Sequence, residues 1–174
     1  MWLANGFTTI PRIGGQVNIG QSLGADRPEA AAEYARGALR MGAFLGILYG
    51  IISVVFHRQL IDFFMLNSPE VIRDARIYLL ITCGLIVFSF LDQVLGGILA
   101  AMGNTVTTFR VTTIGLVLNF ILDPVLIFGI GPIPRMGVAG AALATVFAQI
   151  IVFVLYLISV WHEPVIFRNL HLMK

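Results

Sequence analysis

The sequence predicts an all-α membrane protein, a polytopic bundle of about five transmembrane helices. Two observations support this fold class. Of the 174 residues, 58% are hydrophobic and only 11% are charged, whereas a soluble domain carries about 25% charged residues. The apolar residues also gather into stretches that approach the ~20 residues needed to cross a bilayer. A chain this small cannot bury so much apolar surface in its own core, but lipid can cover it.

The first 24 residues are the least regular part of the chain. Residues 1–10 are mostly apolar, Pro11 and Arg12 interrupt them, and Gln16 and Gln21 follow. Polar groups at membrane depth face protein or water. We therefore expect this segment to span the membrane and to line a polar cavity, with Arg12 near an interface or paired with an acid. An interfacial or disordered leader is the alternative.

Four long apolar stretches follow, separated by charged or turn-forming breaks. They run from about Met41 to Phe56, from Ile77 to Met102, from Val111 to Ile130 and from Val138 to Trp161. The last three are long enough to span a bilayer. The first becomes long enough if residues 35–39 extend it, which requires that the Arg36 side chain snorkels to the interface.

The breaks between these stretches have the chemistry of helix ends. Pro28 suits the first turn of a helix, and Ser68 suits an N-cap ahead of Pro69. Residues 103–105 read as a tight turn, and the glycines and prolines of residues 129–134 end one helix before the last begins.

Small residues recur at helical spacing. Gly42, Gly46 and Gly50 lie four residues apart and form one smooth helix face. Such a face lets a neighbouring helix approach closely. We expect it to pack inside the bundle, with dimerisation as the alternative.

The distribution of lysine and arginine predicts the orientation. The break at residues 24–40, the break at 103–110 and the C-terminal tail together carry six basic residues, and the opposite loops carry four. The positive-inside rule then places the first three regions in the cytoplasm of a multi-pass cell-membrane protein.

Several functional classes find no support in the sequence. The basic residues are scattered, so no stripe suits nucleic acid. Cys83 is the only cysteine, which excludes an internal disulfide. The histidines lack metal-ligand spacing, and no nucleophile–base arrangement predicts an enzyme. We expect no cofactor.

Two carboxylates lie inside apolar stretches, where burial disfavours their charged form. Asp123 has Asn119 one turn earlier on the same helix face and Thr112 two turns before that. Pro124 follows it, and the missing N–H of a proline favours a kink. These oxygens suit a proton or a sodium ion. Because intramembrane acids are usually functional, we interpret Asp123 and Asn119 as a cation site, with a structural Asp123 as the alternative.

The second carboxylate, Asp92, is as deep in its stretch but has no neighbouring proline or carboxamide one turn earlier. A structural bond and a functional role are equally open for it. Thr145 and Gln149 lie one turn apart on the last stretch. We expect Thr145 to line the same cavity as Asp92 and Thr112, and Gln149 to join helices.

Four segments resemble the multidrug and toxic compound extrusion (MATE) transporters. They are GQVNIGQSLGA at 15–25, LAAMGNT at 99–105, NFILDPVLIFG at 119–129 and GVAGAALAT at 137–145. They resemble, in order, the end of the family's second helix, the turn after its fourth, its fifth helix and the start of its sixth. The resemblance covers nearly the whole chain.

The resemblance implies a fold of twelve helices in two six-helix lobes, and export of organic cations and other toxic compounds in exchange for protons or sodium ions. It implies cation coupling by Asn119 and Asp123, with Pro124 as the kink and Thr145 near the site. Residues 1–174 then form a single transmembrane lobe that lacks the family's first helix. The second lobe is absent too, so another lobe or subunit is an expected partner, beside membrane lipid and small-molecule organic cations.

Two rival functions remain open. One is a flippase for lipid-linked sugars of a related family, which needs a basic cavity for phosphate; Arg12 is the only cation that fits there. The other is a non-transporting membrane fragment or assembly subunit.

Overall fold

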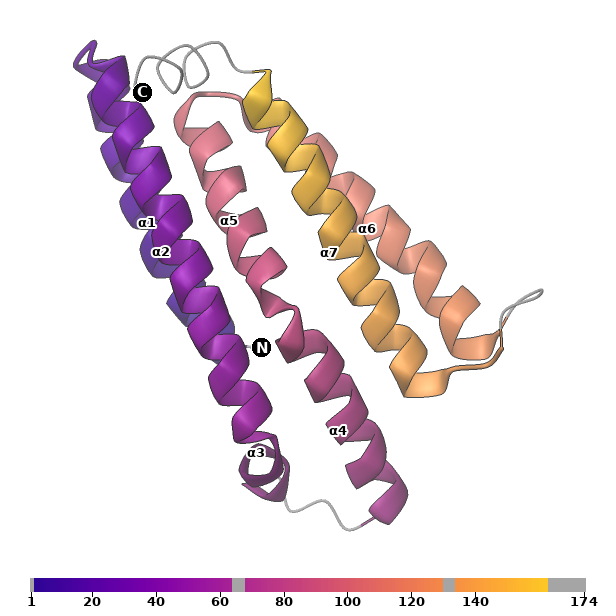
Figure 1. Cartoon of the computed structure of the whole chain (residues 1–174). Helices are drawn as coiled ribbons and strands as arrows, with labels where there is room; N and C mark the ends of the chain where they lie inside the picture. The colour runs from indigo at the N-terminus through magenta and orange to yellow at the C-terminus, as the bar shows by residue number, and fades with distance from the viewer. Residues whose placement is uncertain (1, 64–67, 130–133, 163–174) are drawn as a thin grey trace.

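A computed structural model describes residues 2–63, 68–129 and 134–162, and this part of the chain is built from helices without a strand. The helices are α1 (Trp2–Gly24), α2 (Pro28–Val55), α3 (His57–Phe63), α4 (Pro69–Gly84), α5 (Ile86–Ala101), α6 (Thr105–Phe128) and α7 (Gly137–Trp161). Figure 1 shows α1 and α2 on one side of the bundle, α6 and α7 on the other, and α5 between the two pairs. The predicted all-α helix bundle is confirmed.

The number of clear spans is three or four. α2, α6 and α7 are long and apolar enough to cross a membrane, and α4 with α5 gives a fourth span if the bent pair acts as one. The fifth expected span, α1, has 23 residues and is therefore ~34 Å long. Because it carries several polar residues, α1 is not among the helices that are apolar enough to cross a membrane. It is also one helix, because it continues through Pro11 without a break.

The stretch from Ile77 to Met102 is not one straight helix, which corrects the sequence expectation. α4 ends at Gly84, α5 begins at Ile86, and their axes differ by 46°. No charge or proline marks this break. Gly84 has no side chain to pack and lowers the helix propensity at the bend.

The expected helix ends are mostly found where the turn residues stand. Pro28 occupies the first turn of α2. Asn104 caps α6 by accepting a hydrogen bond from the backbone N–H of Thr107 at 3.2 Å. Gly129 ends α6 in the left-handed conformation, with φ of 71°. Ser68 stands at the N-cap of α4, but its side chain makes no capping bond. Most of the predicted break at 129–134 lies outside the described residues.

The glycine face of α2 packs inside the bundle, as expected. A Cβ at Gly46 would lie 3.0 Å from the Cα of Val87 and 3.1 Å from the Cβ of Phe90. A Cβ at Gly50 would lie 3.0 Å from the carbonyl oxygen of Cys83. Only glycine therefore allows α2 to approach the α4–α5 pair this closely.

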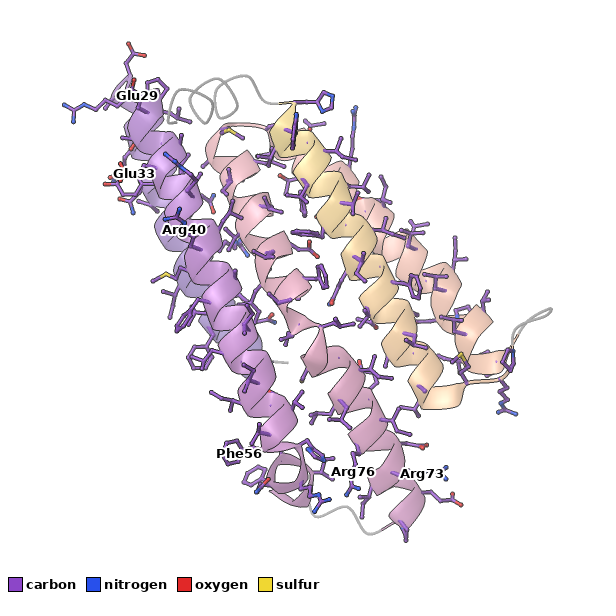
Figure 2. All side chains as sticks on the ribbon, in the orientation of Figure 1. Glu29, Glu33, Arg40, Phe56, Arg73 and Arg76 are labelled. Atoms are coloured by element: carbon purple, nitrogen blue, oxygen red, sulfur yellow. The ribbon has the colours of Figure 1, made fainter. Side chains whose placement is uncertain are left out.

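Large apolar side chains cover the outside of the bundle. Phe44 is 65% exposed, Phe109 is 71% exposed and Phe120 is 81% exposed. Charged side chains instead gather toward the ends: Figure 2 shows Glu29 at one end of the bundle and Arg73 at the opposite end. An apolar surface with charged ends is the arrangement that a bilayer requires.

Candidate functional site

A cavity of about 550 Å³ lies among α1, α5, α6 and α7. Small residues make room for it, because α5 contributes two glycines and an alanine to the wall while α7 contributes an alanine. The lining also carries ten polar side chains, an unusual density for a bundle this apolar. They are Arg12, Gln16, Asp92, Gln93, Thr108, Thr112, Asn119, Thr145, Gln149 and Tyr156.

Arg12 enters this cavity from α1. Its Nη1 donates a hydrogen bond to Oε1 of Gln93 at 3.2 Å. The Nε2 of Gln93 donates to the hydroxyl of Thr8 at 3.3 Å. This short chain of hydrogen bonds ties α1 to α5 and fixes the orientation of the glutamine amide. Pairing of Arg12 with an acid, one of the two expected alternatives, is not found among the described residues.

Three oxygen atoms in the lining are buried without a hydrogen-bond partner. They are Oδ1 of Asp92, Oδ1 of Asn119 and Oε1 of Gln149, from three different helices. Buried acceptors are nearly always satisfied, so each such group calls for a specific explanation. Oxygen acceptors can take a proton, a sodium ion or the N–H group of a ligand.

Gln149 therefore differs from its expected role. It was expected to join helices, but it is in the cavity lining and its buried Oε1 has no hydrogen-bond partner in the described chain. The side-chain hydrogen bond from α7 to a neighbouring helix comes instead from Tyr156, whose hydroxyl lies 3.1 Å from Oγ1 of Thr112. The Thr112 hydroxyl also donates to the carbonyl of Thr108 at 2.8 Å. The hydroxyl of Thr145 turns back onto its own helix and donates to the carbonyl of Ala141 at 3.0 Å.

The structure separates the two intramembrane carboxylates. Asp92 is in the lining together with Asn119. Asp123 is half-buried on α6 and is not in the lining. It lies four residues beyond Asn119 on the same helix face, ~6 Å further along the axis. α6 continues through Pro124 as one helix. The cation-coupling role of Asp123 and Asn119 and the gating role of Pro124 remain predictions.

The sequence predicted that Asp92, Thr112 and Thr145 line a cavity, and all three are in this lining together with Asn119 of the predicted cation site. The sequence analysis overlooked Gln93, Thr108 and Tyr156. A signal for Tyr156 was present: the polar residues of α7 stand at positions 145, 149, 156 and 159, which is the spacing of one helix face. Gln93 offered none, because nothing in the sequence pairs it with α1. No cluster of three or more acidic, histidine or cysteine side chains that could hold a metal ion occurs among the described residues.

Comparison with known proteins gives a consistent family. A family model described as MatE matches residues 6–125. Over 154 residues the chain is 31% identical to a Shewanella oneidensis protein named FAD transporter, a match that covers 86% of this chain and 33% of the relative. Over 151 residues it is 29% identical to a Thermotoga maritima protein named probable multidrug resistance protein NorM, covering 86% and 32%. The chain thus spans about a third of the length of these relatives.

Solved structures with the same fold exist. An inward-facing multidrug resistance MATE family transporter of the MOP superfamily superposes with a TM-score of 0.83 at 22% identity, over 90% of this chain and 34% of that one. An outward-facing structure of such a transporter gives a TM-score of 0.80 at 24% identity, over 91% and 34%. The helix bundle is therefore that of one part of a longer transporter fold.

Proposed function

The chain belongs to the MATE family, whose members are secondary transporters and not enzymes, and from this premise we propose that it is one lobe of a proton- or sodium-coupled antiporter that exports drugs and organic cations. The observation that carries the proposal is the cavity itself. It is polar, it lies inside an apolar bundle, and it holds three oxygens that lack a partner. An intramembrane cavity with unsatisfied acceptors suits a cationic cargo.

In this proposal Asp123 and Asn119 bind the coupling ion. Asn119 offers a free amide oxygen at the cavity wall, and Asp123 offers a carboxylate one turn away. A proton or a sodium ion at Asp123 neutralises the half-buried carboxylate, and the adjacent Pro124 favours bending of α6 at that point. Bending of α6 then releases the substrate outward. In this proposal the gradient of the coupling ion drives transport, and no cofactor takes part.

A second lobe or another subunit completes the transporter. Alternating access requires two units that move against each other around a central site. The described bundle is one such unit. We propose that the end formed by the start of α2 and the start of α6 faces the cytoplasm, because Arg27, Arg36, Arg40 and Arg110 lie near it and the positive-inside rule favours this orientation.

The substrate range of the family extends beyond organic cations, because the Shewanella relative is named an FAD transporter. A flippase for lipid-linked sugars is less well supported. Such a protein needs several cations for phosphate groups, and Arg12 is the only basic residue in the described cavity lining.

The coupling role is tested with Asp123→Asn in the chain together with its partner lobe, reconstituted in liposomes with ethidium. An imposed proton or sodium gradient should drive ethidium transport in the unsubstituted protein and not in the variant, because the amide keeps the shape and loses the titratable charge. Asp74→Asn on α4, outside the cavity, is the matched control and should transport normally. Undiminished gradient-driven transport by Asp123→Asn would contradict the proposal.

The non-transporting alternative has its own test. It predicts that ethidium does not bind to the chain in lipid nanodiscs at any pH or sodium concentration. Saturable ethidium binding would exclude it.

A further inference from the structure

A second pocket, of about 520 Å³, lies at the end of the bundle where α4 and α7 begin. None of its lining residues belongs to the cavity described above. Figure 1 shows the start of α7 beside α4, and the two helices pack against each other. With 25 residues, α7 is ~37 Å long and exceeds the ~30 Å hydrocarbon core of a bilayer. The pocket therefore lies near the depth of the lipid headgroups.

The pocket brings together two arginines from different parts of the fold. Arg73 belongs to α4, and Arg135 stands two residues before α7. Asp74 is the acid in the lining, and its Oδ1 lies 3.6 Å from Nε of Arg73. This contact engages one of the five N–H groups of that guanidinium. Arg135 has no ion-pair partner in the part of the chain that the structure describes. Two arginines and one aspartate therefore leave the described lining with an uncompensated positive charge.

An apolar wall adjoins these charges. Ile77 lies one turn after Arg73 on the same face of α4. Met136 and Val138, which are 37% and 39% exposed, line the pocket where α7 starts. Met136 stands at the N-cap of α7 and makes no side-chain capping bond, and the positive end of that helix adds to the charge of the arginines. Cationic groups beside an apolar wall match a molecule that has both a phosphate and an acyl chain, whereas free phosphate would leave the wall uncovered.

We propose that this pocket binds an anionic phospholipid of the adjacent leaflet, whose headgroup phosphate lies between Arg73 and Arg135. The acyl chain of the lipid then lies against Ile77 and Val138. Arginine suits this role because its planar guanidinium donates parallel hydrogen bonds to phosphate oxygens, and basic pockets between membrane helices bind anionic headgroups. The lipid is a bound component of the fold and not the transported molecule. It joins α4 to the start of α7, at the end of α4 that is farther from the bend at Leu85.

Native mass spectrometry of the full chain in detergent tests the proposal with a matched pair of lipids. Dioleoylphosphatidylglycerol carries a net negative charge, and dioleoylphosphatidylcholine has the same acyl chains without a net charge. The chain should bind its first phosphatidylglycerol about fivefold more tightly than its first phosphatidylcholine, the factor that one basic residue near a membrane surface supplies. Inorganic phosphate at millimolar concentration should not displace the phosphatidylglycerol, because it makes no contact with the apolar wall.

Substitutions locate the lipid. Arg135→Gln and Arg73→Gln should each weaken phosphatidylglycerol binding about fivefold, so that the preference over phosphatidylcholine disappears. Arg135→Lys keeps the charge and should retain most of the preference. Arg58→Gln on α3 is the matched control, because Arg58 is exposed at the same end of the bundle and outside the lining. It should change neither affinity. The side chains of Arg73, Arg135 and Arg58 are all exposed, so the variants should fold, and circular dichroism checks that they do.

Equal affinity of the unsubstituted chain for the two lipids would overturn the proposal, as would an unchanged preference in the folded double variant Arg73→Gln, Arg135→Gln. A loss of affinity in Arg58→Gln as large as that in Arg135→Gln would also overturn it, since the attraction would then come from the general charge of this end of the bundle. Displacement of phosphatidylglycerol by inorganic phosphate would show a site for free anions, and the lipid assignment would be wrong.

Discussion

The two faces of α5 show how one helix serves stability and function separately. One face packs against α2, where Phe90 and Val94 are 0% and 1% exposed and fill the space left by Gly42 and Gly46. The other face carries Asp92 into the cavity. On the first face the atoms are close-packed and apolar. On the second, a carboxylate oxygen is left without a partner.

The contrast follows from the membrane environment. Lipid is as apolar as leucine, so helices associate in a bilayer through close packing and not through the hydrophobic effect. The α2–α5 face provides that packing. The cavity face lacks this close packing, and its unsatisfied polar groups lower the stability of the fold. A helix face that lowers stability in this way is expected at a binding site, where function requires the polar groups.

The largest expected effect comes from filling the packed face. Gly46→Ala should lower the free energy of unfolding by about 1–3 kcal/mol, because the new Cβ meets the backbone of Val87, which cannot turn aside. Gly37→Ala on the same helix is the matched control. No atom lies within 4 Å of a Cβ there, so it should stabilise the helix by up to about 1 kcal/mol.

Denaturant unfolding of both variants in detergent, followed by circular dichroism, measures the difference. If the two alanines behave alike, the close approach of α2 and α5 is not what holds this part of the bundle together.

The packed face could be predicted from the sequence almost entirely. The spacing of Gly42, Gly46 and Gly50 defines a helix face without any knowledge of its partner. Local signals likewise predicted the turn at residues 103–105 and the helix end at Gly129, since turns and caps depend on residues close in sequence. The bend at Leu85 escaped prediction because no proline or charge marks it, and because the packing of α4 against α2 and α7 is a long-range effect.

The cavity could be predicted only in part. Depth within an apolar stretch is a local property, so Asp92 and Asp123 both stood out. Which of them faces the cavity depends on how α5 and α6 are rotated against α1 and α7, and the sequence does not encode that rotation in any short pattern. For the same reason Arg12 was expected near an interface or paired with an acid, although it lies against Gly97 in the cavity wall.

A smaller effect, of opposite sign, is expected on the cavity face. Gln149→Met has nearly the same shape and removes the buried oxygen that lacks a partner. Leaving such an oxygen unsatisfied costs about 1–3 kcal/mol, so the variant should be more stable by about 1 kcal/mol. It should also bind ethidium more weakly, because the amino groups of the dye lose one acceptor.

Thermal unfolding and dye binding on the same samples check both parts of this expectation. Gln21→Met, at an exposed position of α1, should change neither quantity. A destabilised Gln149→Met would mean that the glutamine joins helices after all, as the sequence first suggested.

The smallest effect concerns the hydrogen bond that crosses the cavity. Tyr156→Phe removes the hydroxyl that lies 3.1 Å from Oγ1 of Thr112 and should cost only about 0.6 kcal/mol, the average for such bonds in membrane proteins. The threonine still donates to the carbonyl of Thr108, so no donor is orphaned. Tyr34→Phe, at a position 47% exposed, should have no effect.

The Tyr156 hydroxyl also lies close to α5, at Gly96. A Cβ at Gly96 would lie 3.1 Å from the Tyr156 hydroxyl oxygen, so Gly96→Ala should destabilise the unsubstituted chain and should be better tolerated beside Tyr156→Phe. The two substitutions should therefore be non-additive, with the double variant more stable than the sum predicts by at least about 0.5 kcal/mol. Strict additivity in the unfolding free energies would mean that α5 and α7 do not contact each other at Gly96 and Tyr156. The cavity face of α5 would then lack the close glycine packing that its opposite face makes with α2.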